Sequence, residues 1–168
     1  MKKAGILFLC AAFLFTVSSA FAETITIQAD NDTYIDKVYP DTSFGQKWSL
    51  LTSGSTTKPA NGLLHFDFAS LPNSAIITGV TVTFLVHGNH SSTQYSIHPL
   101  STQWAEASAT WNLAETGISW TTAGSDYDTA AFSEVPLPAS TPEWVVADIT
   151  SLVCDEQGKI KSAAADNG

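Results

Sequence analysis

The sequence lacks arginine altogether, and its seven lysines face 16 acidic residues, which gives a formal net charge of −9. Two of the lysines stand at positions 2 and 3, so beyond residue 22 five lysines oppose 16 acidic residues, a difference of −11. A surface of this sign repels phosphate backbones, and no basic run interleaved with aromatic residues is present, so nucleic acid is not an expected partner. The simpler interpretation of the same acidity is that it keeps an exported protein soluble.

Cysteine is nearly as scarce as arginine: the sequence has two, Cys10 and Cys154. Cys10 lies in an N-terminal segment where two lysines precede an apolar core and small residues lead up to Ala22. This pattern predicts a secretory signal peptide over residues 1–22, cleaved after Ala22, and hence a secreted or cell-surface protein. No other apolar run is long enough to cross a bilayer, so membrane insertion is not expected. The one remaining cysteine excludes an intramolecular disulfide, so packing alone must hold the fold.

The clearest strand pattern lies in residues 62–86, where apolar and polar residues alternate in two runs. The side chains predicted to share a buried face are Leu64, Phe66 and Phe68 in the first run and Val80, Val82, Phe84 and Val86 in the second. A period of two with β-branched and aromatic residues is typical of strands that bury one face. Pro72 interrupts the pattern between the runs, because proline has no N–H to donate to a ladder. We expect this pair of strands at the centre of an antiparallel β-sandwich.

Shorter strands are predicted on both sides of this centre, separated by polar turns. Their expected ranges are residues 23–29, 48–52, 95–100, 132–137 and 143–153, whereas residues 102–120 are expected to form a long ordered loop. No amphipathic helix and no linker is apparent. The pattern predicts an all-β fold, a jelly-roll-like antiparallel β-sandwich in a single domain over residues 23–153, followed by a short polar tail over residues 154–168.

Five phrases, taken in order, carry a resemblance to a known family. They are ADNDTYID at residues 29–36, PDTSFG at 40–45, LHFDFASLP at 64–72, WAEASATWN at 104–112 and ADITSLV at 147–153. Together they resemble the DNRLRE domain, also called the disaggregatase-related domain, which is similar to carbohydrate-binding module family 96. The resemblance implies a jelly-roll sandwich of secreted and surface proteins, often joined to polysaccharide-active enzymes, without catalytic machinery of its own. An alginate-binding member is known, but the scarcity of basic residues here argues against alginate.

Tryptophans are the first candidates for a ligand site, because an exposed indole stacks on the apolar face of a sugar while neighbouring polar groups bond its hydroxyls. We select Trp104, Trp111 and Trp120, with Asp126 and Asp128 nearby as hydroxyl partners. Trp104 and Trp111 have an alternative role as core residues that anchor the loop. Trp120 is followed by polar residues and glycine, so it is the one expected to be exposed.

A second candidate site is a cluster of carboxylates beside turns. Asp30, Asp32 and Asp36, with Asp41 close by, offer the hard oxygen ligands that suit a structural calcium ion. The alternative is that these carboxylates accept hydrogen bonds from local backbone N–H groups, as aspartates in turns commonly do.

A catalytic role is not expected. The carboxyl groups of Glu106, Glu115, Asp126 and Asp128 could in principle supply the acid pair of a glycosidase, but nothing in the sequence fixes their separation.

The sequence therefore predicts a secreted, non-catalytic carbohydrate-binding module for a neutral polysaccharide. The alternative is a structural or adhesive surface module that self-associates or pairs with a partner chain. Residues 154–168 contain one large apolar residue, Ile160, where the resembled family usually continues with closing strands. We expect an open sheet edge there that another chain could pair with.

Overall fold

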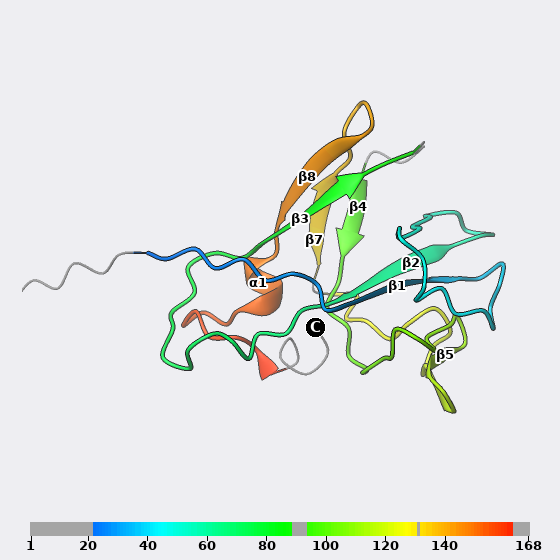
Figure 1. The fold of residues 1–168 in the computed structure, drawn as a ribbon, viewed down its shortest axis with the longest axis horizontal. Helices are drawn as coiled ribbons and strands as arrows, with labels where there is room; N and C mark the ends of the chain where they lie inside the picture. Colours follow the sequence, from blue (N-terminus) through cyan, green and yellow to red (C-terminus); the bar gives the residue numbers. More distant parts are fainter. Residues whose placement is uncertain (1–21, 89–93, 131, 163–168) are drawn as a thin grey trace, which may run out of the picture.

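The computed structural model describes residues 22–88, 94–130 and 132–162, so the predicted signal peptide up to residue 21 lies outside them. The fold is all-β with one short helix. Its elements are β1 (Asn31–Asp36), β2 (Ala60–His65), β3 (Thr81–Val86), β4 (Gln94–Ile97), β5 (Leu113–Glu115), β6 (Ile118–Ser119), β7 (Ser133–Pro136), β8 (Glu143–Asp148) and α1 (Thr150–Val153). The strands form four antiparallel pairs, β1–β2, β3–β8, β4–β7 and β5–β6 (Figure 1). The predicted all-β class is confirmed.

The first core cluster lies between the β3–β8 and β4–β7 ladders, which pack as the two layers of a sandwich. Val82 and Val86 of β3 are buried together with Val145 of β8 and the fully buried Val135 of β7. The alternate residues of β3, such as Thr83, face outward and are exposed. The predicted alternation of β3 is therefore confirmed, and burial of its β-branched face is what stabilises this half of the molecule.

A second core cluster lies under β1 and β2. Ile35 of β1 and Leu63 of β2 are buried against Ala109, Ala114 and Trp120, which come from the long loop and the small β5–β6 hairpin inside it. The loop predicted over residues 102–120 is thus an ordered layer that covers the β1–β2 ladder. Its backbone is fixed locally, for example by the Ala109 N–H, which donates to the carbonyl of residue 105 at 2.7 Å.

Four predictions about strands are wrong. Residues 23–29 and 48–52 are not strands, and most of their side chains are exposed. The first run of the predicted central pair ends at His65, so Phe66 and Phe68 lie beyond β2 and pack against the first core cluster instead. β2 and β3 do not pair with each other: turns at Leu71 and Ala75 carry the chain from one core cluster to the other.

The predicted strand over residues 143–153 is β8 followed by the one-turn helix α1. The chain then lies against the sandwich as far as it is described: the Lys161 N–H donates to the Val153 carbonyl at 2.8 Å, and the Ile77 N–H donates to the Gly158 carbonyl at 2.9 Å. Ile160 packs against the first core cluster. Within the described residues, no helix has the length and apolar character needed to span a membrane.

Candidate functional site

The tryptophan predicted to be exposed is buried. Trp120 directly follows β6, and only 5% of its surface is accessible. Its indole Nε1–H donates to the Thr110 carbonyl at 2.9 Å. The short β5–β6 hairpin turns this side chain beneath the loop, where it packs with Ile35 and Leu63. The expectation that Trp120 is exposed is therefore wrong, and its indole face is not accessible to a sugar.

Trp104 and Trp111 take the alternative role considered for them, since both pack against the same cluster as Trp120. The Trp104 Nε1–H is buried and has no hydrogen-bond partner among the described residues. The Trp111 ring lies on Gly124, where an added Cβ would come within 2.6 Å of Cζ2. The three indoles anchor the loop to the β1–β2 ladder.

Asp126 holds a turn together rather than standing free. Its carboxylate accepts hydrogen bonds from the Thr121 N–H and the Thr122 N–H, each at 2.8 Å, and from the Thr102 hydroxyl at 3.0 Å. Partial burial raises the pKa of this carboxyl, but the hydrogen bonds outweigh that effect and the net pKa is lowered. Asp128 is exposed, and its carboxylate accepts one bond, from the Ala130 N–H at 2.8 Å.

Three of the four carboxylates in the predicted calcium site have hydrogen-bond partners in the structure. Asp30 is paired with the His65 Nδ1 at 2.6 Å, and this hydrogen bond is the main cause that lowers the pKa of Asp30. Asp36 accepts from the Val38 N–H at 2.7 Å, and Asp41 accepts from the side-chain amide of Asn112 at 2.8 Å. No group of three or more histidine, cysteine, aspartate or glutamate residues suited to a metal ion occurs in the described part of the chain, which includes Asp32. Calcium binding stays a prediction.

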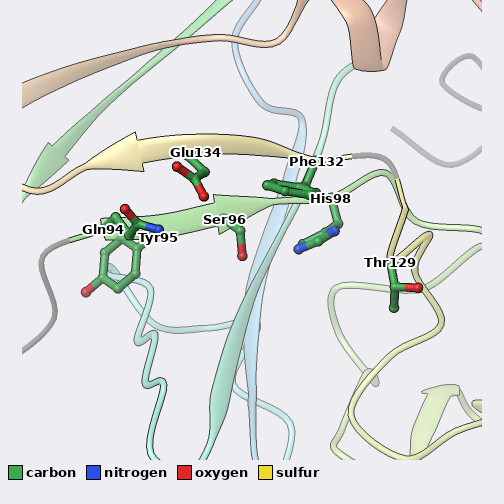
Figure 2. A pocket seen from close by; sticks show the side chains of 7 residues that line it. All are labelled: Gln94, Tyr95, Ser96, His98, Thr129, Phe132 and Glu134. Carbon is green, nitrogen blue, oxygen red and sulfur yellow. The ribbon is translucent and has the colours of Figure 1, made fainter.

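The structure brings together a different set of residues on the outer face of the β4–β7 ladder (Figure 2). Here an open groove of about 310 Å³ is lined by side chains from both strands and from the loop before β7. The lining residues are Gln94, Tyr95, Ser96, His98, Thr129, Phe132 and Glu134. The register sets Ser96 directly opposite Glu134, because β4 and β7 run antiparallel. Their polar side chains therefore lie on one face.

Aromatic rings border one end of this groove. The His98 ring lies between Tyr127, with centroids 4.9 Å apart, and Phe132, with centroids 5.6 Å apart. The His98 Nδ1–H donates to the Asp128 carbonyl at 3.0 Å, which fixes the ring on the loop that carries Tyr127. Phe132 and Tyr127 nevertheless remain largely exposed. In Figure 2, Phe132 and His98 lie next to each other at the end of the two strands, with Thr129 on the neighbouring loop.

This arrangement combines exposed aromatic faces with an amide, hydroxyls and a carboxylate. Rings of this kind stack on the C–H faces of a sugar, and the polar groups exchange hydrogen bonds with its hydroxyls. An open groove accepts a chain rather than enclosing a single small molecule. These residues are not predictable from local sequence patterns, because they come from segments about 30 positions apart that only the β4–β7 pairing joins. The one local signal is the polar alternation of Gln94, Ser96 and His98.

Comparison with known proteins gives one match, to a family. No curated protein and no solved structure matches the chain. The sequence model of carbohydrate-binding module family 96 matches residues 23–165 and so includes β1 to β8, α1 and the segment after it. Because the match spans well over half of the chain, the protein belongs to carbohydrate-binding module family 96.

Proposed function

We propose that this module is a secreted, non-catalytic protein that binds a neutral polysaccharide in the groove on the outer face of the β4–β7 ladder. The observation that carries the proposal is the set of exposed rings around His98 beside the polar residues of the groove. The segment that predicts secretion lies in residues 1–22, ahead of the domain.

The charge of the groove supports a neutral ligand. Glu134 is among the lining residues, whereas no lysine is. A carboxylate accepts hydrogen bonds from sugar hydroxyls but repels the carboxylate of a uronic acid. The absence of catalysis is supported by the environment of Asp126, which was a candidate acid. Its oxygens are occupied by three donors, so it is poorly placed to transfer a proton.

Affinity electrophoresis in gels that contain neutral polysaccharides, preceded by a glycan array to choose them, tests the proposal. We expect Phe132→Ala to weaken binding about tenfold, because a stacked ring is lost. Trp144→Ala is the matched control, since Trp144 is an exposed aromatic residue on the other ladder. Glu134→Gln should preserve neutral binding and reduce the discrimination against uronic-acid polymers. If the folded protein binds no polysaccharide, or if Phe132→Ala binds as well as the parent chain, the proposed site is wrong.

A structural or adhesive module is the second candidate, favoured by the outer face of the β3–β8 ladder. Leu85 and Trp144 are direct cross-strand neighbours there, and Val146 is exposed on the same face. Exposed apolar side chains that lie side by side are typical of a surface that associates. Light scattering across a concentration series distinguishes the two: self-association that Trp144→Ala abolishes and sugar leaves unchanged would favour this candidate.

A further inference from the structure

The chain between β1 and β2 forms loops at one end of the β1–β2 ladder (Figure 1), and several of its apolar side chains are exposed. The exposed ones are Val38, Tyr39, Trp48, Leu50 and Leu51, and 90% of the Trp48 surface is accessible. We call residues 37–59 the loop end. Contacts tie it together: the Tyr39 ring meets the edge of Phe44, the Lys47 N–H donates to the Phe44 carbonyl at 2.9 Å, and the Lys37 N–H donates to the Pro59 carbonyl at 3.1 Å.

The charge of the loop end is opposite to that of the whole chain. Lys37, Lys47 and Lys58 are all exposed and belong to it, and Asp41 is its one acidic residue. Two further carboxylate residues adjoin it, because Asp36 accepts from the Val38 N–H and Glu106 packs on Gly45. In the described residues, no hydrogen bond or ion pair engages any of these three ammonium groups. The two other lysines of the domain are engaged: Lys159 Nζ donates to the Ala75 carbonyl at 2.6 Å, and Lys161 Nζ to the Ser151 carbonyl at 2.6 Å.

We propose that the loop end docks the protein reversibly on the surface of an anionic lipid bilayer. Tryptophan favours the boundary between headgroups and hydrocarbon, and the aliphatic side chains gain free energy when they leave water for that boundary. The lysines would meet the negative headgroups. Aliphatic side chains such as Leu50 and Leu51 offer no flat ring for a sugar to stack on, so these side chains favour lipid over polysaccharide.

The excess of acidic residues beyond residue 22, five lysines against 16 carboxylates or −11, does not prevent this docking. Screening in about 0.15 M salt limits charge interactions to roughly 8 Å, so the exposed lysines and the few carboxylates beside them matter more for docking than the distant acidic residues. Each lysine close to an anionic membrane surface raises partitioning about fivefold, and three together raise it about 100-fold.

Sedimentation with lipid vesicles tests the proposal, with the chain starting at residue 23 so that the predicted signal peptide does not contribute. Vesicles of neutral phosphatidylcholine are compared with vesicles that contain phosphatidylserine as well. We expect binding to the anionic vesicles only, lost about 100-fold in the triple variant Lys37→Gln, Lys47→Gln, Lys58→Gln and about tenfold in Trp48→Ala. Trp144→Ala and Lys161→Gln are the controls, an exposed tryptophan and a lysine outside the loop end, and should bind as the parent chain does.

Circular dichroism spectra establish that each variant is folded, and bromine-labelled lipids should quench the fluorescence that Trp48 contributes. The proposal is overturned if the folded parent chain ignores anionic vesicles, or if the triple lysine variant binds them equally well. Retention of the parent chain by a uronic-acid polymer, lost in the triple variant and without vesicle binding, would assign the loop end to an anionic polysaccharide instead. Binding to neutral polysaccharide through the groove is a separate measurement, which these variants should not change.

Discussion

Replacing Asp126 by asparagine tests how the groove is supported. The Asp126 carboxylate accepts three hydrogen bonds, and its backbone carbonyl accepts another from the Ser101 N–H at 3.0 Å. These bonds join the turn at residues 121–126 to the segment that follows β4. Tyr127 continues the connection through its bridge to Leu100, and Asp128 through its contact with His98. The Asp126 carboxylate therefore supports the aromatic border of the groove indirectly, through its neighbours Tyr127 and Asp128.

The loss of stability in Asp126→Asn can be judged from the groups that donate hydrogen bonds to the carboxylate. Asparagine keeps one oxygen, so it can still accept from one backbone N–H, but its amide nitrogen would face the other donor. A hydrogen bond to a charged acceptor contributes about 1.5–3 kcal/mol, and water can reach the exposed N–H that loses its partner, so we expect the free energy of unfolding to fall by about 2 kcal/mol. In urea this lowers the midpoint by about 1–2 M. Asp128→Asn, with its single local bond, should leave the midpoint nearly unchanged.

The stability difference between the parent chain and Asp126→Asn should grow as the pH rises from acid to neutral. The pKa of Asp126 is lowered in the folded protein, so its carboxylate stabilises the fold fully above the unfolded pKa. That contribution is lost as the pH falls through the lower, folded pKa, so the parent chain and Asp126→Asn should differ most near neutral pH and converge below about pH 4. An equal midpoint for Asp126→Asn and the parent chain at pH 7 would show that these hydrogen bonds do not stabilise the turn.

Two further predictions concern Gly124 and the predicted calcium site. Gly124→Ala places a Cβ 2.6 Å from the Trp111 ring at a φ of +98°, and should lower the free energy of unfolding in urea by about 2–4 kcal/mol. Gly117→Ala is the control: Gly117 has a φ of +81° with open space around it, so the loss should be only about 1 kcal/mol. Equal losses would contradict the packing of Trp111 on this turn. If Asp30, Asp32 and Asp36 bind calcium, the ion should raise the melting temperature and Asp32→Asn should abolish the rise, since a ligand of the native state alone stabilises it; identical melts in calcium and in chelator would leave these carboxylates with their local partners.

Sequence patterns predicted the elements that bury one face and failed where partners come from distant parts of the chain. β3 and β8 were predictable because each is a six-residue run rich in valine whose alternate positions face one core. Trp120 was misjudged because its neighbours in sequence are polar, whereas its burial depends on a hairpin and on Ile35, which is 85 positions away. The groove likewise depends on the β4–β7 register, which no local pattern encodes.

The segment after Val153 shows contacts that composition alone does not predict. Its polar residues pair with backbone groups: the Asp155 carboxylate accepts from the Gln157 N–H at 2.9 Å and the Lys159 N–H at 2.8 Å. Gly158 adopts a φ of +70°, which suits glycine, and its carbonyl accepts from the Ile77 N–H. Ile160 is the side chain of this segment that packs on the core. Backbone groups of the segment are already hydrogen-bonded within the chain, so one apolar contact is enough to hold it there. This polar stretch therefore provides backbone partners at Val153 and Ile77, and pairing of another chain at an open sheet edge stays a prediction.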